Sequence, residues 1–264
     1  MTTERQFREV HGIRTAYHIW ETQTAHAPTV LCLHGWGASL DLMAPVAERL
    51  APLGYRVITL DLPGFGETQE PPQAWGVPEY ARFAIQFLEA FQQERVHVIG
   101  HSFGGRMSLI LGAEYPDHFL KFALADSAGV PPKRDITSET RLKAYKTIRD
   151  GLQKVGLKTL SNNLRETYSQ RYGSADFQNT SGVMRETIVR VLNQDLLPYA
   201  GRITHPTLLF WGTADEDTPL WQGELLEKTI PNAGLIRYEG AGHYSYLEHL
   251  SEFIHVVDYF FKND

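Results

Sequence analysis

The segment Gly100–Gly104, which reads Gly-His-Ser-Phe-Gly, holds the side chain best suited to act as a nucleophile. It lies between a strand-like run, VHVIG, and a helical pattern that begins at Phe103. A serine on such a sharp turn needs very small residues two positions before and after it, because larger ones would clash. The turn exposes the hydroxyl and aims the N-terminus of the following helix at it. The pattern therefore predicts a reactive hydroxyl at Ser102.

Two later segments supply the partners that a reactive serine needs. A serine hydroxyl is a poor nucleophile at neutral pH without a base, and the base needs an acid to orient it. Asp215 and His243 each follow a strand-like run. Ligands of open α/β sheets bind beyond the carboxyl ends of the strands, and the order Ser, Asp, His is typical of this kind of turn. We therefore expect Ser102, Asp215 and His243 to meet.

Short β-branched runs alternate with helical patterns, which is typical of a mostly parallel sheet covered by helices on both faces. The expected strands are 7–10, 13–20, 29–33, 55–60, 96–100, 119–125, 207–211 and 235–238. The first two flank a tight turn at His11-Gly12 and should pair antiparallel at one edge. The expected helices are 42–53, one that begins at Pro78, 103–113 and 248–261. The predicted fold class is α/β.

The stretch 131–204 breaks this alternation. It has helical periodicity and many charges but no strand-like run, and it is too long for a simple connection. Three amphipathic helices are expected over 138–154, 157–170 and 181–196, with Ser138 and Ser181 as N-caps. We predict a core in two parts, 1–130 and 205–264, interrupted by a helical cap at 131–204 that forms a lid.

Five motifs in the same order resemble those of the α/β hydrolases, and the resemblance covers nearly the whole chain. They are His34-Gly35-Trp36-Gly37, the D-x-P-G-x-G loop at 61–66, the turn at 100–104, W-G-x-x-D-x-x-x-P at 211–219, and G-x-G-H at 240–243. The resemblance implies an α/β hydrolase fold with an eight-stranded, mostly parallel sheet and a helical cap. It implies Ser102 as the nucleophile, His243 as the base and Asp215 as the acid. It also implies an oxyanion hole made by the backbone N–H groups of Trp36 and Phe103.

Two other aspartates compete with Asp215 for the role of the acid. Asp126 follows the strand 119–125, a position that some α/β hydrolases use, and Asp217 lies two residues beyond Asp215. The spacing within the motif around it favours Asp215. Asp61 is expected to shape its own loop.

Other residues near the motifs are candidates for the substrate pocket. Those expected to line it are Trp36, Phe103, Tyr244 and, in the cap, Tyr145. Further cap residues that could face substrate are Tyr168, Tyr172, Phe177 and Met184, while Arg141, Arg185 and Arg190 could hold a substrate carboxylate. Each could instead serve only packing or the solvated surface. His34 is expected to brace the oxyanion loop, and His101 to point away from the serine.

The composition limits the partners of the chain. With 264 residues, of which 42% are hydrophobic and 21% charged, it has the balance of an ordinary globular protein. Its formal net charge of −6 argues against nucleic acid as a partner. Cys32 is the only cysteine and the histidines lack ligand spacing with carboxylates, so we expect no metal and no cofactor. Without an apolar run of the required length we expect no signal peptide and no membrane span, and a cytoplasmic location.

A Ser-His-Asp set with an oxyanion hole supports acyl transfer to water. The predicted function is therefore hydrolysis of small-molecule carboxylic esters through an acyl-enzyme. A serine argues against the aspartate-nucleophile dehalogenases and epoxide hydrolases of the family. The sequence also resembles capped hydrolases that cleave carbon–carbon bonds in ring-fission products, although His101, Phe103 and Tyr244 depart from the residues common there. That reaction, aminopeptidase or cofactor-free haloperoxidase activity, and a hydrolase-fold receptor with little turnover stay open as alternatives.

Overall fold

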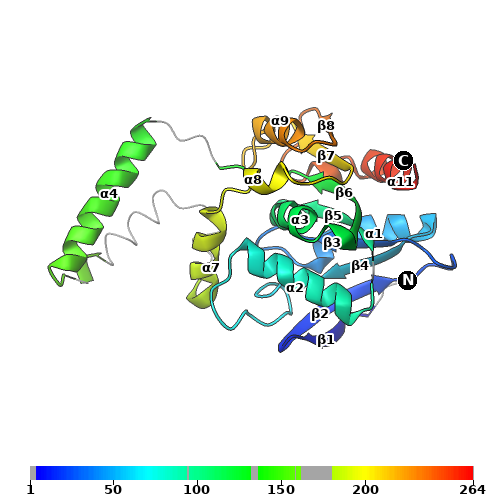
Figure 1. Cartoon of the computed structure of the whole chain (residues 1–264), viewed down its shortest axis with the longest axis horizontal. Coiled ribbons are helices and arrows are strands. Elements are labelled where there is room, and N and C mark those ends of the chain that lie inside the picture. The colour runs from blue at the N-terminus through cyan, green and yellow to red at the C-terminus, as the bar shows by residue number, and fades with distance from the viewer. Residues whose placement is uncertain (1–3, 94, 132–135, 158, 162–179, 264) are drawn as a thin grey trace.

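The computed structural model describes residues 4–93, 95–131, 136–157, 159–161 and 180–263, built around one eight-stranded sheet (Figure 1). The strands are β1 (Gln6–Val10), β2 (Ile13–Trp20), β3 (Thr29–Leu33), β4 (Arg56–Leu60), β5 (Val96–His101), β6 (Phe119–Ala125), β7 (Thr207–Gly212) and β8 (Ala233–Tyr238). Their order is β1-β2-β4-β3-β5-β6-β7-β8. The pairs β1–β2 and β2–β4 are antiparallel and the other neighbours are parallel. The predicted fold class, with eight strands and an antiparallel edge, is confirmed.

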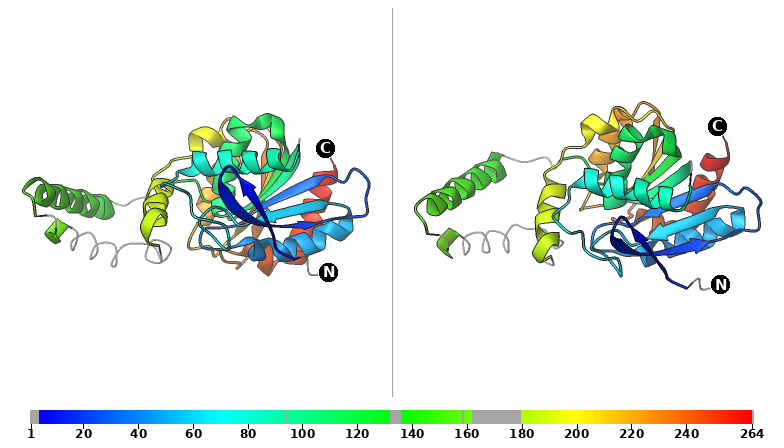
Figure 2. Two further views of the ribbon diagram at one scale, coloured as in Figure 1. Left: turned by 90° about the horizontal axis from the view of Figure 1, so that it is seen from below. Right: turned by 60° about the horizontal axis from the view of Figure 1, so that its bottom comes forward.

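Helices cover both faces of this sheet. They are α1 (Ala44–Leu50), α2 (Val77–Ala90), α3 (Phe103–Glu114), α9 (Leu220–Thr229), α10 (Ser245–Glu248) and α11 (Leu250–Lys262). Alternate residues of the strands face opposite sides, so that Leu31 packs in the cluster of α2 and α3 while Cys32 packs in that of α1 and α11. Figure 2 shows these helices on the two sides of the sheet. Among the described residues, no helix has both the length and the apolar character needed to cross a bilayer.

The pattern predicted as a single helix over 42–53 is divided in the structure. Residues 42–53 lie in a 3₁₀ turn (Leu40–Met43), α1 and a second 3₁₀ turn (Ala51–Leu53). Pro45 and Pro52 stand in the first turns of the second and third pieces, where the missing N–H has no helical partner to lose. The C-terminal helix predicted over 248–261 is α11, which begins at Leu250 and is preceded by the short helix α10. The sequence also gives no strong signal for α9, which lacks a marked apolar stripe.

Within the predicted cap, the structure describes α4 (Ile136–Lys154), α7 (Gly182–Leu192) and α8 (Leu197–Ala200). α4 begins before Ser138, so this serine is not its N-cap. Ser181 does stand at the N-cap of α7, but its side chain makes no capping hydrogen bond. The helix predicted over 157–170 falls mostly outside the described residues. Figure 1 shows α7 beside α2, and α4 farther from the sheet. The division into core and cap stays a prediction.

The turn after β5 requires glycine at position 104, which gives the first prediction. A Cβ on Gly104 would lie 2.1 Å from the carbonyl oxygen of Leu33 in β3. Backbone in a central strand cannot yield at low cost, so Gly104→Ala should lower the free energy of unfolding by about 3 kcal/mol. Urea denaturation measures this loss.

Gly151→Ala is the matched control, because Gly151 lies inside α4 with no atom near its missing Cβ. Alanine is the better helix former by about 1 kcal/mol, so this variant should be as stable as the parent or more so. Equal stability of Gly104→Ala and the parent chain would contradict the packing argument.

Candidate active site

Ser102 stands between β5 and α3 in a backbone conformation that side-chain-bearing residues rarely adopt. Its φ is +50° and its ψ is −104°. Strain of this kind costs about 1–3 kcal/mol and persists only where the surroundings enforce it. The Ser102 N–H donates to the carbonyl of Ala125 in β6 (3.1 Å). Gly35 comes so close that a Cβ on it would lie 3.3 Å from the Cβ of Ser102. The neighbouring strand and the loop after β3 therefore hold the turn.

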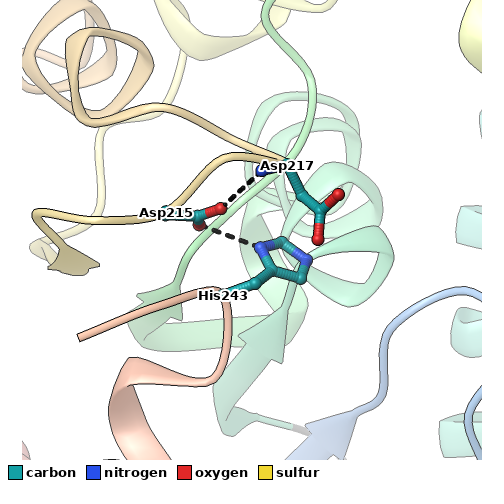
Figure 3. Close-up of side chains that lie close together, drawn as sticks. All are labelled: Asp215, Asp217 and His243. Atoms are coloured by element: carbon teal, nitrogen blue, oxygen red, sulfur yellow. Dashed lines mark hydrogen bonds and ion pairs between the residues drawn. The ribbon is translucent and has the colours of Figure 1, made fainter.

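The loops after β7 and β8 bring Asp215 and His243 together (Figure 3). Nδ1 of His243 lies 2.9 Å from Oδ2 of Asp215. The other oxygen, Oδ1, accepts the N–H groups of Asp217 (2.8 Å) and Thr218 (2.9 Å). An ionised carboxylate only accepts, so Nδ1 carries the proton and Nε2 is left able to take one up. Asp217 is exposed, and in the described part of the chain its carboxylate forms no hydrogen bond with the ring.

Burial and hydrogen bonding act in opposite directions on the pKa values of this pair. Burial alone would lower the pKa of His243, but the hydrogen bond and charge of Asp215 raise it above the ordinary value, with further help from Asp126 and Asp217. Burial alone would raise the pKa of Asp215, but the hydrogen bonds from His243 and Thr218 lower it instead. Both net shifts favour the charged forms, so this pair is suited to stabilise an imidazolium.

Thr218 supports the pair, although no predicted role in the sequence points to it. Its Oγ1 lies 2.7 Å from Oδ2 of Asp215 and 3.3 Å from Nδ1 of His243. A hydroxyl has one proton, which it gives to the nearer carboxylate. The signal in the sequence that could have identified Thr218 is its position three residues after Asp215. An aspartate commonly accepts hydrogen bonds from the backbone N–H groups two and three residues beyond it.

His101 links the turn of Ser102 to the loop of His243. It is buried, and its Nε2 lies 2.8 Å from the carbonyl oxygen of His243. Burial lowers the pKa of His101 to about 3, so the ring is neutral and donates through Nε2. Within the described residues, Ser102 Oγ makes no hydrogen bond to the ring of His243. Such hydrogen bonds are often long before substrate binds.

Asp126, the main rival of Asp215, is fully buried at the end of β6 with a φ of +46°. Its Oδ1 accepts the N–H of Gly212 (2.9 Å). Its Oδ2 accepts both the N–H (3.1 Å) and the hydroxyl (2.7 Å) of Ser245. Burial raises the pKa of Asp126 to about 7 against the pull of these donors. Its carboxylate therefore joins two loops, and the geometry favours Asp215 as the partner of His243.

His34 holds the loop that the sequence predicts to form the oxyanion hole. Its Nε2 accepts the N–H of Leu62 (3.0 Å), so Nδ1 carries the proton and donates to the carbonyl of Gly35 (2.7 Å). The C=O and N–H of one trans peptide point in opposite directions, so this bond also fixes the direction of the Trp36 N–H. Asp61 holds the adjacent loop by accepting two backbone N–H groups.

The two N–H groups predicted to form the oxyanion hole, those of Trp36 and Phe103, make no hydrogen bond among the described residues. Their side chains lie in one aromatic cluster. The ring of Trp36 is 5.3 Å from that of Phe103 and 4.8 Å from that of Phe65, and Tyr80 lies 5.0 Å from Phe103, all edge to face. The surroundings of these donors are therefore apolar.

The remaining pocket candidates are placed differently. Tyr244 lies beside His243, with ring centroids 5.7 Å apart, and is 47% exposed. Tyr145 is not brought to the site, because it lies on α4 beneath the guanidinium of Arg149. Tyr168, Tyr172, Phe177 and the side chain of Arg141 lie outside the described residues.

One group of potential metal ligands occurs among the described residues. Donor atoms of Asp215, Asp217 and His243 lie within 4.8 Å of one another. Two of these residues already share a hydrogen bond, which is the arrangement of an acid–base pair.

Comparisons with known proteins point to one family. A family model described as the alpha/beta hydrolase fold matches residues 28–250. The chain is 27% identical to a pimeloyl-(acyl-carrier protein) methyl ester esterase of Chromobacterium violaceum, over 87% of this chain and 92% of that protein. It is 26% identical to 2-hydroxy-6-oxononadienedioate/2-hydroxy-6-oxononatrienedioate hydrolase 1 of Dechloromonas aromatica, over 87% of this chain and 85% of that one. Among solved structures, an esterase of Exiguobacterium antarcticum matches with a TM-score of 0.75 at 21% identity, over 98% of this chain and 100% of that one.

Proposed function

The chain belongs to the α/β hydrolase fold family, and from that premise we propose that it hydrolyses carboxylic esters of small molecules through an acyl-enzyme on Ser102. One observation carries the proposal. The 2.9 Å hydrogen bond between Nδ1 of His243 and Asp215 leaves Nε2 free to act as a base at the carboxyl ends of the strands, where Ser102 also lies. The proposed reaction uses no metal and no cofactor.

In this reaction Ser102 Oγ attacks the ester carbonyl carbon while Nε2 of His243 takes the hydroxyl proton. The carbonyl oxygen becomes negative and accepts hydrogen bonds from the N–H groups of Trp36 and Phe103. When the tetrahedral intermediate collapses, the carbon–oxygen bond to the alcohol breaks and His243 gives its proton to the leaving oxygen. Water then attacks the acyl-enzyme with the same base, and the carboxylic acid leaves.

The surroundings favour an ester over the diacid named for the Dechloromonas relative. A diacid needs a cation for its second carboxylate. Among the described residues, Arg190, one of the predicted candidates, donates to the carbonyl of Ala74 (2.6 Å). Arg106, four residues beyond Ser102, is buried and donates to the carbonyl of Val191 (2.5 Å). The aromatic cluster beside the oxyanion donors suits an uncharged acyl group.

We also propose that α7 is a fixed wall of the acyl site rather than a moving part of the cap. Besides the bonds of Arg190 and Arg106, Thr187 accepts the N–H of Trp75 (3.2 Å). Gln194, just beyond α7, accepts the N–H of Val77 at the start of α2 (2.7 Å). These anchors run from the middle of α7 to just beyond its C-terminal end and leave the helix little freedom to open.

Met184 is a side chain of α7 that faces the aromatic cluster of Trp36, Phe65, Tyr80 and Phe103. It is buried, and a Cβ on Gly64 would lie 2.3 Å from its sulfur. The hydroxyl of Tyr80 lies 3.9 Å from that sulfur but donates to Pro63 (2.9 Å), so Met184 and Tyr80 meet by packing. Since Tyr80 packs on Phe103, Met184 is one ring removed from a proposed oxyanion residue.

The first test of this function compares three variants with p-nitrophenyl butyrate as substrate. Ser102→Ala should abolish turnover. Asp215→Asn should lower kcat on the order of 10⁴-fold, or about 5 kcal/mol, by analogy with the same change in serine proteases, because it favours the wrong tautomer and removes the charge beside the imidazolium.

Asp217→Asn is the matched control and should keep most of the activity, since its carboxylate does not bind the ring. Thermal melts establish that each variant folds. Turnover that survives in Ser102→Ala would contradict the proposal, and wild-type protein without turnover on a panel of acyl esters would favour the receptor alternative.

The second test concerns acyl length. Met184→Ala removes a side chain from the proposed wall, so it should raise kcat/KM for octanoyl over acetyl esters about tenfold relative to the wild type. Val189→Ala, on the exposed side of α7 at 37% exposure, should leave that ratio unchanged. If the two variants alter the ratio equally, Met184 does not set acyl preference.

A further inference from the structure

The carboxylate of Asp126 binds both of the loops that carry the acid and the base. Gly212, whose N–H it accepts, ends β7 just before Asp215. Ser245, whose N–H and hydroxyl it accepts, lies two residues beyond His243. The carbonyl of Asp126 also lies 3.1 Å from the hydroxyl of Thr218, which in turn donates to Asp215. Asp126, the residue that follows β6, thus contacts the end of β7, Thr218 and Ser245, which flank Asp215 and His243.

Burial of the Asp126 carboxylate and its strained backbone cost folding free energy, which argues that the residue serves the site. A buried carboxylate loses its hydration and needs donors in return. Three donors, one from Gly212 at the end of β7 and two from Ser245 at the start of α10, converge on Asp126, and the bonds they form are of the strong, charge-assisted kind. Its φ of +46° adds backbone strain at the same residue. A residue needed only for packing would require none of these features.

We propose that Asp126 is a positioning residue for His243: it fixes the loop of the base against the loop of the acid, and it places a second negative charge near the imidazolium. This inference rests on the proposed function for its catalytic consequence. Its electrostatic consequence can be measured without any turnover.

The charges that face His243 are few. Asp215 and Asp217 approach from the loop after β7 and Asp126 from the end of β6, while His101 of β5 is neutral because burial lowers its pKa to about 3. With its pKa at about 7, Asp126 is ionised at pH 8 and above. A negative neighbour favours the protonated ring, so removal of this charge must lower the pKa of His243.

The experiment is an NMR titration of the ring nitrogens of His243, in the full chain, for the wild type, Asp126→Asn and Ser245→Ala. Asp126→Asn should move the titration of His243 to lower pH. Ser245→Ala keeps the charge and loses only one donor, so the titration should stay near that of the wild type. In the pH profile of kcat/KM for p-nitrophenyl butyrate, the acid limb should move to lower pH in Asp126→Asn and stay near that of the wild type in Ser245→Ala. The reason is that the base must be neutral to act.

Measurements of kcat/KM test whether Asp126 positions the loop of His243. Ser245→Ala should lower kcat/KM about tenfold at pH 8.5, as expected for the loss of a hydrogen bond to a charged group, and Asp126→Asn should lower it further. An unchanged His243 titration in Asp126→Asn would overturn the charge role, and wild-type kcat/KM in Ser245→Ala would overturn the positioning role. If Asp126→Asn does not fold, Ser245→Ala still decides the second point. A wild-type chain without esterase activity would sink the proposed function but leave the titration informative.

Discussion

The site depends on holding Ser102 in a backbone conformation that its own residue type disfavours. A φ of +50° on a serine costs about 1–3 kcal/mol, and nothing in the side chain offsets it. The neighbouring strand β6 and the loop after β3 supply the contacts that enforce it, and glycine at 35 and 104 permits their approach. The same contacts hold Gly35, which precedes Trp36, against Ser102, and Phe103 follows Ser102 directly in the chain. One strained turn thereby sets the position of both the proposed nucleophile and the proposed oxyanion donors.

Buried polar side chains, more than apolar packing, determine how the surrounding loops sit relative to one another. His34 joins the loop after β3 to the one after β4, and His101 joins the turn after β5 to the loop after β8. Asp126 joins β7 to that same loop. Each is a directional bond to main chain, so each fixes an orientation as well as a distance. Apolar contacts alone would leave the loops free to rotate by amounts that matter for proton transfer.

The sequence predicts much of this, and its failures have physical reasons. The strand runs 30–33 and 122–125 are continuous and apolar because both faces of the sheet are covered, and this signal is local. The motif spacing favours Asp215 over Asp126, although both follow strands that end on the same side of the sheet. The hydrogen bond between Asp215 and His243 is a tertiary contact, and Thr218 and Ser245 become visible only through contacts of this kind. Cap residues such as Tyr145 and Met184 could not be sorted in the sequence, because residue type alone does not tell which face of a cap helix meets the core.

The central claim is that Ser102 is the nucleophile, and the most direct measurement is covalent labelling with a fluorophosphonate followed by peptide mass analysis. Such a reagent reacts with a serine that is activated by a base and flanked by oxyanion donors. We expect one adduct per chain, on the peptide that contains Ser102, and no adduct in Ser102→Ala. An adduct on any other residue, or one that persists in Ser102→Ala, would contradict it.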